Sequence, residues 1–409
     1  MMKLFVGIDV SSKKLDACLM NQDGDVWHTC SVENNLIGAG LLRNQILHHA
    51  QNKSVNAIEI GMEATSIYSW HPAMFFHQDP QLQEFQTKVY TINPKLIHHF
   101  RKAYVDMDKT DYQDAWIIAD RLRFGRLKVS AVLNEQYIAL QRLTRMRFHL
   151  VQNLTREKQI FLQNLFLKCN SFTEEVETSA HGQAIMDFLM ESYSLDEISM
   201  MDLQELADYL REHSHKRFSD PECIAKSIKK AAISSYRLAK CVEDSIDLLL
   251  ATSIQTIRSI NKQIDNLNKA ISQLVESIPN TLQTIPGIGP VFAAGILAEI
   301  GQIERFDNEA GIAKYAGLTW QRSQSGDFEA EETKLIRSGN RYLRYYLVEA
   351  ANSVRRYAPE YRDYYHKKFK EVPKHKHKRA LVLTARKLVR LIDALLRKGQ
   401  IYTPGKVAR

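Results

Sequence analysis

The chain has 409 residues and a net charge of +8 at neutral pH, with 44% hydrophobic and 25% charged residues. This composition excludes a wholly disordered chain, and no apolar run is long enough to span a bilayer. The length suits two or three domains. The five cysteines are odd in number and lack the Cys-x-x-Cys spacing of a zinc site, so we expect a reduced protein of the cytoplasm.

The first 125 residues alternate short β-branched runs with helical patterns. Residues 4–10, 17–20 and 26–30 predict three strands, with a turn signal between the second and the third. The pattern continues as helix 34–50, strand 55–62, helix 66–76, strand 88–92 and helix 112–123. Asn93-Pro94 predicts the end of the last strand. This element order is typical of a ribonuclease H-like α/β domain.

The middle of the chain is helical. Residues 134–170 keep one apolar side, and a second stretch repeats apolar residues at alternating spacings of three and four. The residues of this second seam are Ile257, Ile260, Ile264, Leu267, Ile271, Leu274 and Ile278. Such an a/d seam over about three heptads predicts a coiled coil. The segment from about 170 to 250 looks helical and polar but carries no recognisable motif.

The C-terminal part of the chain is basic. Residues 331–409 contain 21 Lys and Arg against 7 Asp and Glu, whereas residues 1–330 contain 34 against 40. The Lys/His/Arg run at 374–379 precedes an amphipathic helix predicted for 380–397. A basic block on a mildly acidic chain indicates a polyanion partner such as nucleic acid, although a highly soluble surface would have the same composition.

Four carboxylates are candidates for a catalytic site. Asp9 interrupts an apolar strand, where an unpartnered charge is costly, and Glu63 follows the buried run 55–62. Asp111 and Asp114 are one helical turn apart and therefore project from one face. In a ribonuclease H-like fold the first and fourth strands are neighbours, so these side chains converge. Each also has a simpler explanation, as a strand-end charge or as a helix N-terminal charge.

Converging carboxylates need a cation to remain ionised together. Mg²⁺ prefers such hard oxygen ligands and keeps water in its remaining positions. Two ions at one site would stabilise the attacking and leaving oxygens of a phosphodiester displacement. The sequence therefore predicts a magnesium site, with two ions as an option.

Three further motifs suit contacts with nucleic acid. Gly287 and Gly289 precede a helix, as in a helix-hairpin-helix motif, and would let the backbone approach a phosphate, although Pro-Gly is also a common turn. Ser325, next to a glycine in a polar loop, is a weak candidate nucleophile. A later helix opens with residues suited to phosphate, or simply to solvent: Asn340, Arg341 and Arg344.

Taken in order, these motifs resemble one bacterial family of insertion-sequence transposases, family one hundred and ten, which includes the Piv-type invertases. The residues that carry the resemblance are Gly7-Ile-Asp9, Met62-Glu63-Ala-Thr65, Lys109-Thr-Asp-x-x-Asp-Ala115, Pro286-Gly-Ile-Gly289, Tyr315-Ala-Gly-Leu-Thr319, Ser325-Gly326 and Gly339-Asn-Arg-x-Leu-Arg344. They span both ends of the chain in the family's order.

The resemblance implies a RuvC-like catalytic domain at residues 1–128 and a helical, coiled-coil region at 129–280 with an insertion at about 170–250. It implies a helical transposase domain at 281–409. The family's DEDD set corresponds to Asp9, Glu63, Asp111 and Asp114, which would bind Mg²⁺, and its nucleophile corresponds to Ser325.

The implied reaction joins the serine covalently to DNA, as a phosphoserine that a DNA hydroxyl then resolves. The implied partners are donor and target DNA, a non-coding bridge RNA, and further copies of the chain in a dimer or tetramer formed through the coiled coil. Two alternatives remain open at this point. One is a RuvC-like nuclease that cuts DNA junctions with water, and the other is a nucleic-acid-binding protein without catalysis.

Overall fold

A computed structural model of the chain describes residues 2–64, 67–104, 110–127, 135–215, 217–321, 324–325, 328–329, 334–335 and 338–404. The chain forms two compact units. The first comprises Met1–Tyr137, Ile300–Lys314 and Leu396–Lys398, and the second comprises the remaining residues. In the described part of the chain no helix has the length and hydropathy required to cross a membrane. All five cysteines are free thiols.

The first unit is built on a mixed five-stranded sheet. Its strands are β1 (Lys3–Val10), β2 (Lys14–Met20), β3 (Val26–Glu33), β4 (Ala57–Glu63) and β5 (Lys88–Ile92), in the spatial order β3-β2-β1-β4-β5. β1 pairs antiparallel with β2 and parallel with β4. The prediction of a ribonuclease H-like α/β domain at this end of the chain is confirmed.

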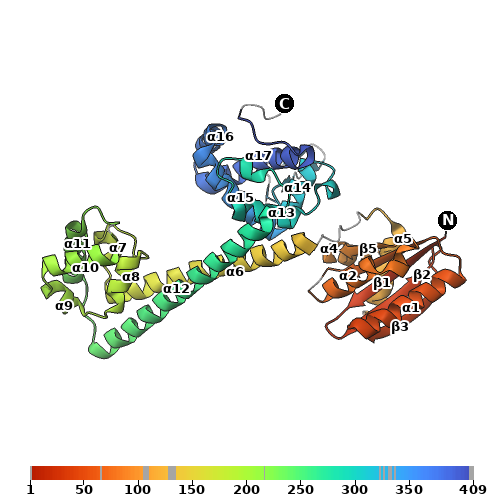
Figure 1. Cartoon of the computed structure of the whole chain (residues 1–409), viewed down its shortest axis with the longest axis horizontal. Coiled ribbons are helices and arrows are strands. Elements are labelled where there is room, and N and C mark those ends of the chain that lie inside the picture. Colours follow the sequence, from red (N-terminus) through yellow and green to blue (C-terminus); the bar gives the residue numbers. More distant parts are fainter. Residues whose placement is uncertain are drawn as a thin grey trace. The chain divides into compact units, whose positions relative to one another are not determined.

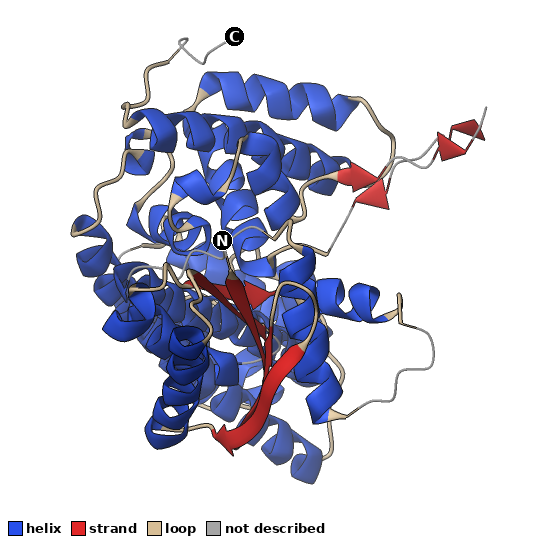
Figure 2. Ribbon diagram, turned by 90° about the vertical axis from the view of Figure 1, so that its right-hand side faces the viewer, coloured by secondary structure: helices blue, strands red, loops and turns tan. Residues whose placement is uncertain are grey.

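Helices cover both faces of this sheet (Figures 1 and 2). Alternate residues of β1 point to opposite faces, so Leu4, Val6 and Ile8 meet a core formed with α1 (Leu36–Asn52). The helices α2 (Trp70–Gln78) and α3 (Pro80–Gln83) complete that layer, and the short helix η1 (Ile67–Ser69) precedes α2. The opposite face packs against α4 (Pro94–Arg101) and α5 (Asp111–Phe124).

Three of these elements differ from the sequence prediction: β2, α3 and α4. α3 is a short helix between the predicted helix 66–76 and the predicted strand 88–92. β2 begins at Lys14, three residues before the predicted apolar run, because the polar residues Lys14 and Asp16 on either side of Leu15 still pair with β3. α4 was not predicted. Asn93-Pro94 does end β5, but it also begins a helix, because the Asn93 side chain accepts a hydrogen bond from Lys95 N and proline suits the first helical position.

Two long helices dominate the second unit, α6 (Glu135–Lys168) and α12 (Lys240–Glu276) (Figure 1). Arg147 Nε donates to Asn268 Oδ1 at 2.6 Å, and Lys168 forms an ion pair with Asp247. These contacts are 21 residues apart on each helix, so the helices run antiparallel along about 30 Å.

The apolar seam of α12 is buried in part. Its members at seven-residue spacing are buried, and those between them are half-buried. The buried set is Ile257, Ile264, Ile271 and Ile278. A coiled coil between protomers stays a prediction.

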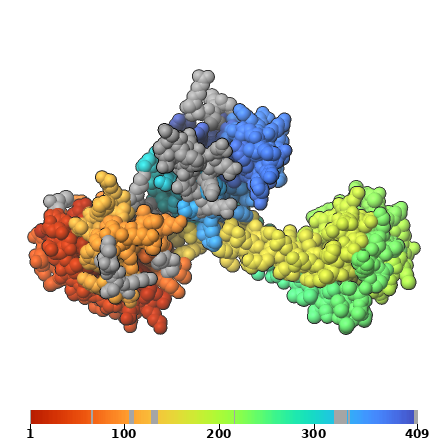
Figure 3. Space-filling model, turned by 180° about the vertical axis from the view of Figure 1, so that it is seen from behind, coloured from red at the N-terminus to blue at the C-terminus, as the bar shows by residue number. Residues whose placement is uncertain are grey.

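Residues 171–235 form a helical lobe, made by α7 (Phe172–Glu175), α8 (Gln183–Met190), α9 (Leu195–Met200), α10 (Leu203–His213) and α11 (Pro221–Ser234). Its core is shared with the adjoining ends of α6 and α12. Figure 3 shows this lobe, in yellow-green, closing over the ends of the two long helices. Its two connections are joined at a neck, where Tyr236 N donates to Asn170 Oδ1 at 3.1 Å and Ser171 N donates to Ser235 Oγ at 3.2 Å.

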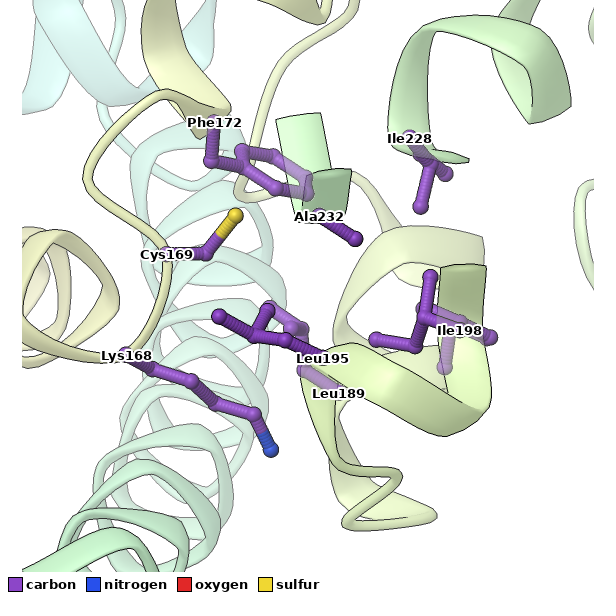
Figure 4. Close-up of a pocket in the computed structure, with 9 residues that line it drawn as sticks. Lys168, Cys169, Phe172, Leu189, Leu195, Ile198, Ile228 and Ala232 are labelled. Atoms are coloured by element: carbon purple, nitrogen blue, oxygen red, sulfur yellow. The ribbon is translucent and has the colours of Figure 1, made fainter. Parts of the chain in front are cut away.

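A small cavity lies in the core of this lobe, beside Lys168 and Cys169 (Figure 4). Its volume is about 10 Å³, which is at the lower limit for one water molecule, and its lining is almost wholly apolar. The cavity is therefore a packing defect rather than a ligand site.

The C-terminal part of the chain is mostly helical. It contains η2 (Leu282–Thr284), α13 (Pro290–Ile300), η3 (Ile303–Arg305), α14 (Glu309–Ala316), α15 (Arg341–Tyr357), α16 (Pro359–Lys370) and α17 (Lys376–Lys398). α13 packs closely on α15, because a Cβ at Gly295 would lie 2.3 Å from the Tyr346 ring. Glu299, at the end of α13, is buried and accepts hydrogen bonds from Arg145 at 2.7 and 2.9 Å.

Candidate active site

Three carboxylates lie in one row across the sheet. Asp9 on β1 is directly opposite Asp16 on the antiparallel strand β2. Asp9 and Glu63 are the next residues after the paired Ile8 and Met62 on the parallel strands β1 and β4. Residues in register on neighbouring strands point to the same face, so all three side chains project on the side that α5 covers.

Two glycines bring α5 down onto this face. Gly7 and Gly61 are paired in register. Each lies two residues before a carboxylate, Asp9 or Glu63, and therefore on the same face of the sheet. A Cβ at Gly7 would lie 2.2 Å from the Ala115 carbonyl oxygen, so only glycine allows the helix to approach this closely. A Cβ at Gly61 would lie 2.9 Å from the Leu122 side chain.

The first turn of α5 carries the other two predicted carboxylates. Thr110 caps this helix by accepting a hydrogen bond from Gln113 N at 3.3 Å, which fixes where Asp111 and Asp114 begin it. One helical turn rises about 5.4 Å and two strand residues about 6.6 Å. Because Ala115 lies over Gly7, the preceding turn of α5 lies near the level of Asp9.

The electrostatics of Asp9 reflect this crowding. Burial raises the pKa of Asp9, and the neighbouring Asp111 and Asp16 raise it further. Arg101 and a backbone hydrogen bond at Val10 act in the opposite direction. Negative charge around Asp9 therefore exceeds the local positive charge, and such a site favours a cation.

Arg101 is the main cation at this site. It ends α4 and forms an ion pair with Asp114, and both side chains are about three-quarters buried. Sequence reasoning missed Arg101 because it missed α4. It also missed Asp16, because a charged residue at the polar start of a strand looks like an exposed one.

The donor set suits magnesium, since every candidate ligand is a carboxylate oxygen. Among the described residues, however, no three His, Cys, Asp or Glu side chains already surround a single point at metal-binding distance. Glu63 has other interactions in this structure, and Asp114 is paired with Arg101. The residues thus fit the ion chemically, and their side chains would have to rearrange to hold it.

The predicted nucleophile lies in the second unit. Ser325 belongs to β7 (Gln324–Ser325), which pairs with β8 (Phe328–Glu329). The adjoining strands β6 (Trp320–Gln321) and β9 (Lys334–Leu335) also pair. The side chain of Ser325, and its neighbour Gly326, lie outside the described part of the structure.

The two glycines before α13 differ in their surroundings: Gly287 packs against α15, whereas Gly289 is next to open space. Gly287 has φ +97°, and a Cβ there would lie 2.9 Å from Val354 Cα on α15. Gly289 has open space around it. An open surface depression, lined partly by Ser353 and Tyr357, lies against these residues.

Asn340 has a structural position at the start of α15. Its Oδ1 accepts hydrogen bonds from the backbone of Tyr342 and Leu343, and its Nδ2 donates to Glu299 at 2.7 Å. The Arg344 guanidinium donates to the Ala316 carbonyl at 3.0 Å. Among the three polar residues predicted here, Arg341 is the most exposed.

Comparison with known proteins finds similar sequences along most of the chain. Residues 6–167 match the family model "DEDD_Tnp_IS110: Transposase", and residues 280–366 match "Transposase IS116/IS110/IS902 family". The chain is 25% identical over 411 residues to the "Pilin gene-inverting protein" of Moraxella bovis, which covers 98% of both chains. It is 25% identical over 321 residues to the "Insertion element IS116 uncharacterized 44.8 kDa protein" of Streptomyces clavuligerus, covering 76% of each.

Proposed function

Because the chain belongs to the IS116/IS110/IS902 family of transposases, which are DNA phosphoryl-transfer enzymes, we propose that it cuts and rejoins DNA through a covalent serine intermediate. The observation that supports this most is the carboxylate row of the sheet, with Asp9 and Glu63 on the face covered by the acidic first turn of α5. The pilin gene-inverting relatives suggest that inversion of a DNA segment is one outcome of such a reaction.

In this proposal the four carboxylates bind metal ions. Asp9, Glu63, Asp111 and Asp114 would hold one or two Mg²⁺ ions. When bound, such an ion supplies positive charge that stabilises the phosphate oxygens during displacement. Arg101 would release Asp114 as the site assembles, and its guanidinium would then be free to contact a phosphate.

Ser325 carries the covalent step. Its hydroxyl oxygen attacks the scissile phosphorus, a bond forms between that oxygen and phosphorus, and the bond from phosphorus to the leaving deoxyribose oxygen breaks. The leaving oxygen takes up a proton. A hydroxyl of the partner DNA strand then attacks the phosphoserine, which restores the serine and keeps the bond energy of the diester.

Recognition would come from several elements. Gly287 and Gly289 would bring backbone amides of α13 to a phosphate, and Arg341 and Arg344 would contact the nucleic acid from α15. A non-coding bridge RNA would select donor and target by base pairing. A dimer or tetramer joined through α12 would complete a composite site, since Ser325 and the carboxylates belong to different units.

The test is a search for the covalent adduct. The full chain is incubated with Mg²⁺, donor and target DNA, and RNA transcribed from the DNA that flanks the gene, and the products are then denatured and sized. We expect a protein–DNA adduct with the wild type and with Ser323→Ala, and none with Ser325→Ala. Asp9→Asn should also abolish it, whereas Asp23→Asn in an exposed turn should not.

Efficient cleavage without any adduct would contradict the serine mechanism and support a nuclease that uses water. Full activity of Asp9→Asn would contradict a catalytic role for the carboxylate row. Activity that does not depend on the flanking RNA would leave the serine chemistry standing and remove the guide.

A further inference from the structure

A strongly basic turn joins the last two helices. We call residues 366–379 the basic turn; they comprise the end of α16, the connection and the first residues of α17 (Figure 1). Seven of these residues are Lys or Arg, and a single one, Glu371, is acidic. The turn begins at residue 366, where the match to the second family model ends.

The single acid is already neutralised. Glu371 accepts from Lys368 Nζ at 2.7 Å and from Arg379 at 3.1 Å. The other five cations are exposed, and in the described part of the chain none has an acidic partner in salt-bridge range. These five are Lys367, Lys370, Lys374, Lys376 and Lys378. The basic turn therefore presents a concentrated positive charge, and no acidic side chain among the described residues forms an ion pair with these five lysines.

The positive charge of the basic turn is unfavourable for the helix α17 that it precedes. The first turn of α17 contains Lys376 and Lys378 and no acid, although the N-terminal end of a helix dipole is itself positive. His375, just before it, has φ 52° and makes no side-chain cap. A sequence selected only for stability would place an acid or a capping side chain here. Binding a polyanion would remove the repulsion.

The neighbouring aromatic rings argue for a duplex rather than a single strand. Proteins that hold single strands stack bases on free aromatic faces. Here each Tyr and Phe ring of α16 already has a cation over it: Lys387 over Tyr361 and Tyr364, Arg355 over Tyr365, and Lys376 over Phe369, at 4.4–5.8 Å from the ring centres. The basic turn thus offers charge to phosphates, whereas the Tyr and Phe faces beside it are already covered.

We propose that the basic turn is a sequence-independent clamp for the phosphate backbone of duplex DNA. The flexible ammonium groups of Lys374, Lys376 and Lys378 contact phosphates across the groove edges and release bound counterions. The proposal rests on the proposed action of this chain on DNA. It requires neither the carboxylate row nor Ser325, because it concerns DNA binding and not catalysis.

The test compares the wild type with the variant Lys374→Gln/Lys376→Gln/Lys378→Gln. The matched control is Lys226→Gln/Lys230→Gln/Lys240→Gln, which removes the same charge from exposed positions elsewhere in the second unit. Fluorescence anisotropy in EDTA measures binding to two duplex DNAs of unrelated sequence, to single-stranded DNA and to duplex RNA, at about 50 to 200 mM salt.

The expected result is a weaker affinity for both duplex DNAs by the same factor, with the slope of log K against log salt reduced by about three. The control variant should keep the wild-type slope. The clamp variant should melt at or above the wild-type temperature, because removing the lysines relieves repulsion at α17. A lower melting temperature would indicate a structural role and contradict the proposal.

Two further outcomes would overturn it. If the clamp variant kept its affinity for duplex DNA but lost affinity for RNA, the basic turn would be an RNA contact. If neither changed, it would be a solvated surface. At saturating DNA with Mg²⁺ the clamp variant should still form the serine adduct, so a loss of chemistry with normal binding would count against the proposed mechanism and not against the clamp.

Discussion

Asp9 and Asp16 stand directly opposite each other on the antiparallel strands β1 and β2, on the face covered by α5. Like charges in directly opposed positions destabilise a sheet. A fold retains such a pair most readily when a ligand of opposite charge is bound during function. The row of Asp16, Asp9 and Glu63 should therefore affect both stability and cation binding.

Asp16→Asn should stabilise the metal-free protein and weaken its binding of cations. Removing one of two opposed charges should raise the free energy of unfolding by about 0.5 kcal/mol, measured by urea denaturation in EDTA. Calorimetry with Mn²⁺ or Mg²⁺ should show a lower affinity, because less negative charge surrounds Asp9. Asp23→Asn should change neither quantity. A destabilised Asp16→Asn protein would show that this carboxylate has a structural partner.

The pH dependence of stability should carry the signature of Asp9. Because burial, Asp111 and Asp16 raise its pKa in the folded chain, the folded state holds this proton more tightly than the unfolded state. Stability is therefore lost as the pH rises from the ordinary aspartate pKa of 3.8 through the raised value. The advantage of Asp9→Asn over the wild type in EDTA should grow across that interval and then level off. A difference that does not vary with pH would contradict this.

Arg101→Gln should cost stability in a way that magnesium offsets. The variant loses its ion pair with Asp114 and a cation near Asp9, at about 1 kcal/mol in EDTA. Saturating Mg²⁺ should reduce this loss, since the ion supplies the missing positive charge. Arg43→Gln, which removes a pair with Asp79 elsewhere in the first unit, should lose the same amount with or without Mg²⁺. Identical losses for Arg101→Gln in both buffers would contradict a shared role.

Gly7→Ala should disrupt the floor of the site. The added methyl would lie 2.2 Å from a carbonyl oxygen of α5, so the helix must move, at about 3 kcal/mol. Gly40→Ala on α1 is the matched control, because its Cβ would meet open space and alanine favours a helix. Thermal melting should show a large decrease for the first variant and none for the second.

Asn340→Ala and Arg341→Ala should separate structure from nucleic-acid binding. Asn340 caps α15 and donates to the buried Glu299, so its loss should cost about 2 kcal/mol. Arg341 is exposed, so Arg341→Ala should melt within a degree or two of the wild type and bind nucleic acid more weakly. If Arg341→Ala lowered the melting temperature and Asn340→Ala weakened only the binding of nucleic acid, these assignments would be wrong.

The sheet could be predicted because its central strands β1 and β4 are short, mostly apolar segments that contain Val and Ile at alternate positions. The placement of Asp9 and Glu63 followed from the strand order alone. Asp16 and Arg101 could not be found in this way. Their positions depend on the register of β2 and on α4, whose start at Asn93-Pro94 has the same sequence signal as the end of a strand. The Asn-Pro pair was the available signal, since both residues are favoured where a helix begins.

The neck of the helical lobe, at residues 170–171 and 235–236, determines what a deletion of the lobe would do. Because Asn170 and Tyr236 are hydrogen-bonded neighbours, the 65 residues between Ser171 and Ser235 leave and re-enter the long helices at one point. A short link across the neck would remove the lobe but would expose apolar side chains of α6 and α12 that share its core, among them Phe161, Leu165 and Leu250. A module of another fold inserted at the same two positions would have to cover these apolar faces, so the lobe and the ends of the long helices should unfold together.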